Sequence, residues 1–113
     1  MTSGALTILH PVTDLEKAKA VFTALLGTGP AWDAEYYVGY EVAGQHIGLV
    51  PNGAANGLTV ATAFWHVEDL DERLAALTAA GAEIVQEPTD VGGRRVAKVR
   101  DADGNVLGLS QAG

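Results

Sequence analysis

Apolar and polar positions along the chain predict the same series of elements twice. Residues 5–9 are mostly apolar and β-branched, which predicts a strand that ends at His10-Pro11. A helical spacing follows, with Leu15, Ala18, Phe22 and Leu25 on one apolar face. In the second half, a strand is predicted over residues 60–67, and a second apolar helix face is formed by Leu70, Leu74 and Leu77.

Start and stop signals bound both predicted helices. Thr13 and Glu16 have the spacing of a capping box, Gly27 can end the first helix, and Pro30 prevents its continuation. The corresponding signals in the second half are Asp69, Glu72 and Gly81. Because the same signals occur in the same order, the two halves are expected to share one layout.

Shorter strand-like segments separated by turns follow each helix. They span residues 31–35, 36–42 and 46–50 in the first half, and residues 83–86, 94–100 and 106–110 in the second. Turns are expected at Gly44-Gln45 and over residues 101–104. Two sequence repeats support this layout, since residues 12–15 recur in similar form at 67–70, and residues 44–49 at 104–109.

The pattern therefore predicts one α+β domain built from two tandem βαβββ modules. The first module covers about residues 3–52 and the second about residues 60–112. The small polar residues between them, about 52–59, have the composition of a linker. A single module has one helix for one face of its sheet, so the other face must curl or find a partner.

The period of two in a strand assigns each residue to one side. Ile8, Val12 and Val67 are expected under the helices, as are the apolar residues of the last strands. The residues expected on the open side are Thr7, Leu9, Pro11, His46, Gly48, Val50, Thr62, Phe64, His66, Val106, Gly108 and Ser110. Gly48 and Gly108 would leave floor space for a ligand there, the alternative being a β-bulge.

Composition narrows the function. The chain has 113 residues, 48% of them hydrophobic, and a net charge of −7, which suits one small domain and disfavours nucleic acid or an anionic membrane as a partner. It has no Cys, which excludes disulfides, zinc–thiolate sites and cysteine nucleophiles. No apolar run has the length of a membrane span. We expect a cytoplasmic enzyme or small-molecule binding module.

Aromatic and histidine side chains supply candidate ligand contacts. Four of the seven aromatic residues lie close together, at Trp32, Tyr36, Tyr37 and Tyr40, and their rings could line a ligand cleft or pack into the core or a dimer interface. Trp65 falls on the helix side and is expected in the core. The chain has three histidines: His66 could bind a ligand or act as a general base, His46 could bind a ligand or be solvated, and His10 is expected to be structural.

Four of the seven basic residues lie on one predicted strand, at Arg94, Arg95, Lys98 and Arg100. Such a stripe could hold an anionic ligand group. The interpretation we prefer is a solvated strand face whose charge is balanced by neighbouring acids, namely Glu87, Asp101 and Asp103.

Several of these segments together resemble the vicinal oxygen chelate superfamily, which includes glyoxalase I, extradiol dioxygenases, and fosfomycin- and bleomycin-resistance proteins. The matching segments are residues 12–15, 25–27, 64–70, 80–82 and 101–105, the last being similar to the family's Asp-Pro-Asp-Gly-Asn turn with Ala102 in place of proline. The resemblance implies paired βαβββ modules that form a curved mixed sheet around a cleft, usually in a homodimer.

The resemblance also indicates where the metalloenzymes of the family hold a divalent ion. Their ligands are His or Glu on the first and last strands of each module. The matching positions here are Thr7, Thr62, Gly48 and Gly108, and glycine and threonine are poor ligands for catalytic divalent metals. We therefore expect no metal and no other cofactor at this location.

The favoured hypothesis is a homodimeric protein that binds an antibiotic or a related aromatic or hydrophobic natural product without metal. The residues expected to contact the ligand are Trp32, Tyr37, Tyr40, His46, Gly48, Thr62, Phe64, His66, Gly108 and Ser110. One alternative is a lyase or isomerase in which His66 is the acid–base group, or a glyoxalase-like or dioxygenase-type metalloenzyme that uses other ligands. Another is a dimer that binds no ligand. The sequence leaves open whether modules pair within one chain or between two.

Overall fold

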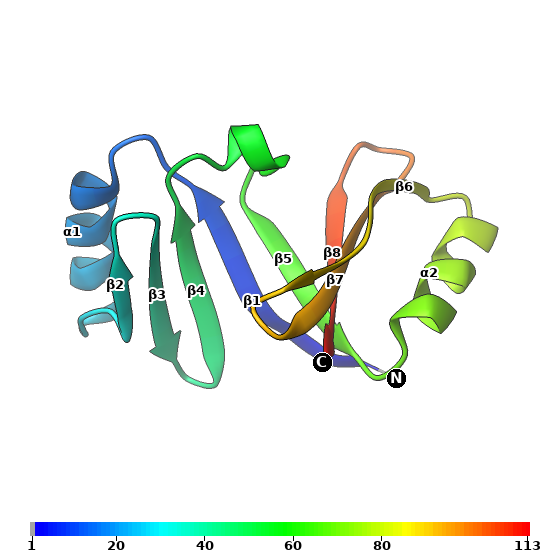
Figure 1. The fold of residues 1–113 in the computed structure, drawn as a ribbon, viewed down its shortest axis with the longest axis horizontal. Coiled ribbons are helices and arrows are strands. Elements are labelled where there is room, and N and C mark those ends of the chain that lie inside the picture. The colour runs from blue at the N-terminus through cyan, green and yellow to red at the C-terminus, as the bar shows by residue number, and fades with distance from the viewer. Residues whose placement is uncertain (1) are drawn as a thin grey trace. The chain divides into compact units, whose positions relative to one another are not determined.

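The computed structural model describes residues 2–113, with only the backbone of Asn56 (Figure 1). The elements in chain order are β1 (Thr2–Pro11), α1 (Leu15–Leu26), β2 (Trp32–Ala34), β3 (Tyr37–Val42), β4 (Gln45–Val50), η1 (Ala54–Asn56), β5 (Thr62–Val67), α2 (Leu70–Ala79), β6 (Glu83–Val91), β7 (Arg94–Arg100) and β8 (Val106–Ala112). The strand–helix–strand–strand–strand order occurs twice. The predicted α+β class and the repeated βαβββ layout are therefore confirmed.

The chain divides into two compact units. The first unit is Thr7–Thr62, and the second is Ala63–Gly113 together with the N-terminal residues up to Leu6. The strand β1 contributes its C-terminal half to the first unit and its N-terminal half to the second.

Both units have the same sheet topology. In the first unit the strand order is β2-β3-β4-β1, with β1 parallel to β4 and the other pairs antiparallel. In the second unit the order is β5-β8-β7-β6, with β5 parallel to β8 and the other pairs antiparallel. Each module therefore places its first strand beside its last one.

The helix boundaries show one wrong prediction. Asp14, and not Thr13, is the N-cap of α1, and its carboxylate accepts a hydrogen bond from the backbone N–H of Lys17 at 3.1 Å. Asp69 caps α2 as predicted, accepting from the backbone N–H of Glu72 at 3.1 Å. Gly27 ends α1 in the left-handed conformation, also as predicted.

Two hairpins differ from the expected turns. The turn between β3 and β4 is formed by Ala43 and Gly44, both with positive φ, so it lies one residue before the predicted Gly44-Gln45. The strand β6 continues to Val91, well past the predicted end at Gln86. A Gly92-Gly93 turn, with both residues at positive φ, then leads into β7.

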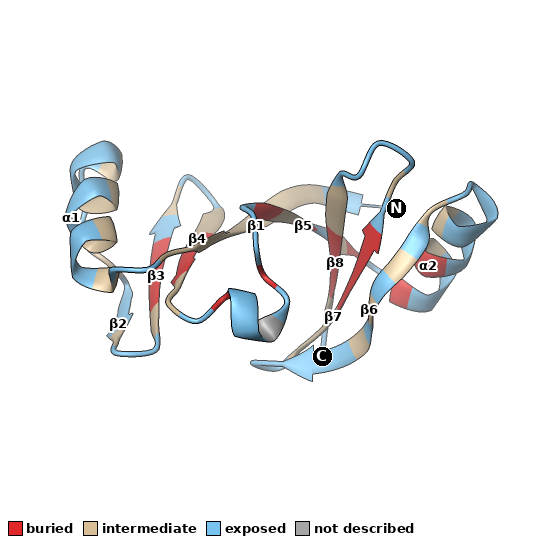
Figure 2. Ribbon diagram, turned by 90° about the horizontal axis from the view of Figure 1, so that it is seen from above, coloured by how far each residue is buried: buried red, intermediate tan, exposed pale blue. Residues whose placement is uncertain are grey.

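Each helix packs on one face of the strands of its own unit, over a core cluster of buried residues. Figure 2 shows buried segments on β3, β4 and α2. In the first unit, the strand residues Val38, Tyr40, Ile47 and Leu49 form the core under α1. Leu26 packs in this core, whereas Leu25, which was predicted to lie on the apolar face, is exposed. At 3.6 residues per turn, Leu26 lies closer than Leu25 to the side of the helix that carries Leu15 and Phe22.

In the second unit, Leu70, Leu74 and Leu77 of α2 pack on Ala97 and Leu109, as the spacing predicted. None of the helices within residues 2–113 combines the length and apolar character needed to cross a membrane.

Candidate functional site

The helix-covered faces of the strands are those that the period of two predicted. Ile8, Val12, Ile47 and Leu49 belong to the core under α1. Val67 and Leu109 belong to the core under α2. The alternate residues of each strand therefore lie on the face opposite the helix, which is the candidate ligand-binding side of each unit.

A hydrogen-bonded chain of three side chains lies on this face in the first unit. Glu41 and Tyr37 come from β3 and His46 from β4. The His46 Nδ1 atom lies 2.6 Å from Glu41 Oε1, and its Nε2 atom is hydrogen-bonded to the Tyr37 hydroxyl. The Tyr37 and His46 rings are nearly parallel, with centroids 5.8 Å apart. Glu41, His46 and Tyr37 thus hold one another in fixed orientations.

The protonation states in this chain follow from Tyr37. Burial, with a smaller contribution from the charge of Glu41, raises the pKa of Tyr37 to about 12. The hydroxyl therefore keeps its proton at neutral pH. An ionised Glu41 carboxylate can only accept, so His46 Nδ1–H donates to Glu41, and the remaining hydrogen bond joins His46 Nε2 and the Tyr37 hydroxyl.

Two paired glycines lie under the Tyr37 ring. Gly39 on β3 is opposite Gly48 on β4. A Cβ atom at Gly39 would be 2.8 Å from the His46 ring, and one at Gly48 would meet the Tyr37 hydroxyl and lie 2.6 Å from Leu9. The floor space expected above Gly48 is therefore taken by the chain's own tyrosine. Glycine is required here because an aromatic side chain packs directly on the backbone.

In the second unit, an aromatic ring likewise packs on a glycine of the last strand. Gly108 is opposite Phe64 in the β5–β8 pair, and a Cβ atom at Gly108 would be 2.5 Å from Cδ2 of the Phe64 ring. Phe64 itself is buried. The space for a ligand that was expected above Gly108 is thus also occupied by a ring from the same unit.

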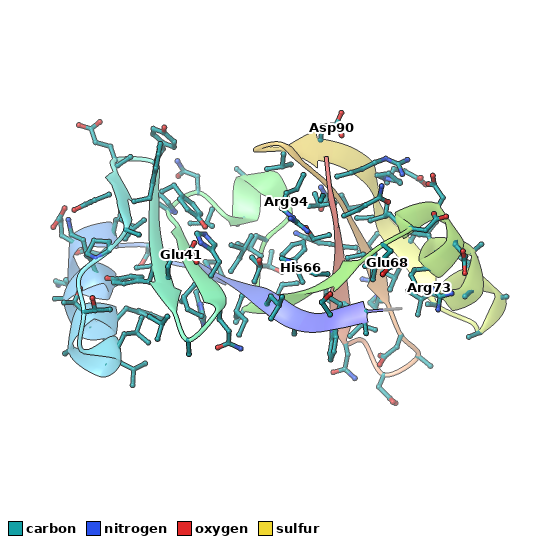
Figure 3. All side chains as sticks on the ribbon, turned by 90° about the horizontal axis from the view of Figure 1, so that it is seen from below. Glu41, His66, Glu68, Arg73, Asp90 and Arg94 are labelled. Atoms are coloured by element: carbon teal, nitrogen blue, oxygen red, sulfur yellow. The ribbon has the colours of Figure 1, made fainter. Side chains whose placement is uncertain are left out.

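A polar cluster accompanies Phe64 on this face. The Arg94 Nε–H donates to the Ser110 hydroxyl at 2.5 Å, and Arg94 Nη2 lies 3.3 Å from His66 Nδ1. Figure 3 labels Arg94 and His66 among the side chains of the second unit. Burial first, and then the charge of Arg94, lower the pKa of His66. His66 is therefore neutral at neutral pH, with Nδ1 accepting from Arg94 and the proton on Nε2.

Lys98 adds a second cation to the same face. It is opposite Gly108 in the β7–β8 pair, and its Nζ lies 5.9 Å from the centroid of the Phe64 ring. Its side chain is only 7% exposed, and this burial lowers the pKa of its ammonium group.

Three of the four positions that the resemblance matches to metal ligands, Thr62, Gly48 and Gly108, do not fit a divalent metal. Gly48 and Gly108 have no side chain and lie under the rings of Tyr37 and Phe64. The Thr62 hydroxyl is buried and donates to the backbone oxygen of Val60 at 2.9 Å. Throughout residues 2–113, no group of three or more His, Cys, Asp or Glu residues is arranged to hold a metal ion.

Tyr40 must be moved from the predicted ligand contacts to the core. Its ring is fully buried on the side of α1 and stacks near Phe22. Its hydroxyl donates to the backbone oxygen of Lys19 at 3.0 Å and lies 2.9 Å from the Thr23 hydroxyl. The period of two indicates this, because Tyr40 alternates with Gly39 and Glu41, which face the other way.

Both tryptophans and His10 have distinct surroundings. Trp32 is opposite Gly39 at the outer strand β2 and is 57% exposed, so its predicted ligand contact stays a prediction. Trp65 lies on the helix side, as expected, beside Val67 and Leu77 in an apolar pocket of about 290 Å³. It is 40% exposed, so its predicted place in the core is wrong. His10 also lies on the helix side and meets Phe22 edge to face, and burial lowers its pKa.

The basic stripe on β7 separates into two kinds of residue. Arg95 forms an ion pair with Asp71 at 3.0 Å, and Arg100 forms one with Glu83 at 2.7 Å, so these two follow the preferred interpretation with different acidic partners from those expected. Arg94 and Lys98 instead belong to the Phe64 face. For these two residues the alternative of a ligand-binding stripe, which was not the interpretation preferred from the sequence, describes their position better, and their spacing of four along a strand places them on one side.

Comparison with known proteins agrees with this architecture. The sequence model of the Glyoxalase/Bleomycin resistance protein/Dioxygenase superfamily matches residues 5–109. No curated protein sequence matches the chain. Similar solved structures include methylmalonyl-CoA epimerase from Mycobacterium tuberculosis, with 19% identity and a TM-score of 0.72 over 99% of this chain and 89% of that chain.

Two further structures illustrate the range of proteins with this fold. A glyoxalase/bleomycin resistance protein/dioxygenase superfamily member from Vibrio splendidus 12B01 has 16% identity and a TM-score of 0.68, covering 93% of this chain and 96% of that one. The Mn(II)-bound glyoxalase from Novosphingobium aromaticivorans has 14% identity and a TM-score of 0.71, covering 98% of this chain and 40% of that one. Identities this low establish a shared fold and no shared substrate.

Proposed function

Because this chain belongs to the glyoxalase/bleomycin resistance protein/dioxygenase superfamily, we propose that it binds a small organic molecule without a metal ion. The ligand contacts lie on the strand faces opposite the helices. The ligand class we favour is an antibiotic or a related aromatic or hydrophobic natural product, which the protein sequesters and releases unchanged.

One observation carries this proposal. At the last-strand positions that correspond to metal ligands in the superfamily, the chain has Gly48 and Gly108, and each lies under an aromatic ring of its own unit. Tyr37 covers the first and Phe64 the second. Restoring a ligating side chain at either glycine would require the ring to move, which supports direct contacts to the ligand in place of a metal.

The neighbouring polar groups suit recognition of an organic molecule. The hydrogen-bonding atoms of Tyr37 and His46 are fixed by Glu41, and those of His66 by Arg94. Groups held in one orientation lose little entropy when they bind a ligand. Sequestration needs only such pre-oriented donors, acceptors and apolar surface, with no proton transfer.

The assembly and location belong to the same proposal. We place the protein in the cytoplasm as a homodimer, with no nucleic acid or membrane partner. Sedimentation equilibrium of the purified protein tests the dimer, and a monomer at all accessible concentrations would contradict it.

A thermal-shift screen against natural-product antibiotics, with and without divalent metals, tests the binding function. A ligand that binds only the native state raises the melting temperature by mass action. We expect compounds that raise it equally in the presence and absence of a chelator, and that are recovered with unchanged mass. A failure of every aromatic or hydrophobic compound to shift the melting temperature would favour a dimer that binds no ligand.

A metal-free lyase or isomerase is the second candidate, and the state of His66 favours it. Burial and Arg94 lower the pKa of His66, so its imidazole is neutral at neutral pH and can accept a proton at Nδ1 when a substrate displaces the Arg94 contact. Incubating the bound compound with the protein and measuring its mass and isomeric composition separates the two functions. A product lost in a His66→Gln variant would establish catalysis and overturn sequestration.

A further inference from the structure

Two cations of the second unit lie on the same side of β7, on the face opposite α2. Arg94 and Lys98 are four residues apart on the strand, while Ala97, which lies between them, belongs to the buried core. The whole chain carries a net charge of −7. A partly desolvated guanidinium such as that of Arg94 is costly unless its charge is compensated.

The hydrogen bonds of Arg94 leave one edge of its guanidinium group available. A guanidinium has five N–H groups. The Nε–H is directed at Ser110 Oγ, 2.5 Å away, and one Nη2–H at His66 Nδ1, 3.3 Å away. Three N–H groups remain, two on Nη1 and one on Nη2. The Nη1–Nη2 edge has the planar two-point geometry that matches a carboxylate.

Arg94 differs from the other arginines of its strand in its partners. Arg95 and Arg100 each form an ion pair with a carboxylate, Asp71 and Glu83 respectively. Within residues 2–113, both hydrogen-bond partners of Arg94 are neutral groups, and neither is an acid. Its positive charge is thus oriented but not neutralised by the described part of the chain.

Lys98 strengthens the positive potential beside this edge. Its ammonium group is held over the Phe64 ring, 5.9 Å from the centroid, and its side chain is 7% exposed. Charges act more strongly in such a desolvated site than in water. His66, whose pKa is lowered and which is therefore neutral, adds no repulsion to an anion.

We propose that the Arg94 guanidinium is the anchor for the carboxylate group of a small organic acid, with Lys98 supplying additional positive charge. This inference rests on the proposed binding function and specifies its ligand class. A planar carboxylate matches the free edge of one arginine, whereas a phosphate dianion would bring a larger desolvation cost to this face.

Binding of benzoate, compared with its uncharged analogue benzamide and with inorganic phosphate, tests the proposal. The probes are titrated into the full-length protein while the Nε–H signal of Arg94 and the ring signals of His66 are followed by NMR. We expect benzoate to shift both sets of signals saturably. Benzamide should bind at least about tenfold more weakly because it cannot make a charge-assisted two-point contact. Phosphate should also bind at least about tenfold more weakly because of its larger desolvation cost.

Arg94→Gln and Arg95→Gln form a matched pair of variants on the same strand with the same change of charge. Arg94→Gln should lower benzoate affinity by about tenfold or more, whereas Arg95→Gln, on the opposite side, should leave it nearly unchanged. Thermal unfolding shows whether each variant folds. If Arg94→Gln does not, Arg94→Lys keeps the charge and loses the planar fork, and it should still weaken benzoate binding.

Any one of four results would overturn the proposal. They are no saturable shift at Arg94 with benzoate, equal affinity for benzoate and benzamide, tighter binding of phosphate than of benzoate, and equal losses of benzoate affinity in the two glutamine variants. These failures differ from a failure of the proposed function. If natural-product hits bind but their methyl esters bind Arg94→Gln as tightly as the acids bind the unaltered protein, only the carboxylate inference is lost. If the hits are chemically converted, sequestration is lost.

Discussion

The hydroxyl group of Tyr37 lies over Gly48, in the space that any side chain at that position would need. The same hydroxyl is hydrogen-bonded to His46, which is in turn bound to Glu41. This one relationship explains both why a glycine stands in the last strand of the first module and why a metal ligand does not.

Replacing Gly48 with alanine should therefore destabilise the protein. The new Cβ would collide with Tyr37 and with Leu9 at 2.6 Å, and overpacking of this kind costs about 1–3 kcal/mol in the free energy of unfolding. Urea-induced unfolding measures the change. Gly29→Ala is the matched control, since a Cβ there meets nothing within 4 Å, and it should change stability by less than about 1 kcal/mol. Equal effects of the two substitutions would show that Tyr37 does not fill the space over Gly48.

Gly108 and Phe64 should behave as a coupled pair. Gly108→Ala places a Cβ 2.5 Å from the Phe64 ring and should be destabilising, whereas the same change in a Phe64→Leu background should cost less because the smaller side chain can move aside. A double-mutant cycle by urea unfolding should give a coupling of about 0.5–3 kcal/mol. Additive effects would contradict the packing of the ring on Gly108.

The two residues at the start of α1 should differ in their contribution to stability. Asp14→Ala removes the carboxylate that accepts the Lys17 N–H and should cost about 1 kcal/mol. Thr13→Ala lies one residue outside the cap and should cost clearly less. Thermal unfolding of both variants decides between them, and a larger loss for Thr13→Ala would restore the capping box predicted from the sequence.

Much of the fold could be predicted from periodicity and start signals, because these are local properties. The period of two placed Ile8, Ile47 and Leu49 under α1 correctly. The cap of α1 was misplaced because Thr13 and Asp14 are both good N-cap residues, and sequence spacing alone does not decide which one adopts the extended backbone. The length of β6 was underestimated because Pro88 hid a strand that pairs with β7 up to Val91.

The site was less accessible to prediction than the fold. The sequence pointed to the strand face that carries His46 and His66. It did not show that Tyr37 and Phe64 would pack on the glycines of the neighbouring strand. Such contacts depend on strand register, which brings Phe64 opposite Gly108, and register is a tertiary property. Tyr40 was assigned to the ligand because of its neighbours in sequence, although its parity places it in the core.

Tyr40 and Tyr37 provide a further prediction because they differ in role. Tyr40→Phe removes a hydroxyl that bonds Lys19 and Thr23 under α1, and it should lower the free energy of unfolding by about 1 kcal/mol while leaving ligand affinity unchanged. Tyr37→Phe removes the partner of His46 on the candidate face and should weaken binding of a screened ligand. Calorimetric titration of both variants tests this, and a loss of affinity only in Tyr40→Phe would reverse the assignment.

Stability should decrease as the pH falls from neutrality through the ordinary histidine pKa of 6.5. Burial lowers the pKa of His10 and, together with Arg94, that of His66. In this range the unfolded chain binds protons that these folded imidazoles do not, so the free energy of unfolding falls until the pH is below their folded pKa values.

Urea unfolding at a series of pH values measures this dependence. A His10→Gln, His66→Gln double variant should show a flatter profile between neutrality and about pH 5. Asp101, whose pKa is lowered from 3.8 by hydrogen bonds with Asn105, should not contribute there, because its stabilisation is lost only below that value. An unchanged slope in the double variant would show that neither histidine is responsible.

Binding of a screened natural product in the presence of a strong chelator tests metal-independent sequestration most directly. Calorimetric titration of the purified protein, followed by mass spectrometry of the recovered compound, gives affinity, stoichiometry and chemical identity together. Metal-independent sequestration predicts saturable binding with the same Kd before and after chelation, unaffected by added Mn²⁺, Ni²⁺ or Zn²⁺, and a compound of unchanged mass. Binding that appears only with added metal, or a compound recovered with altered mass, would contradict it.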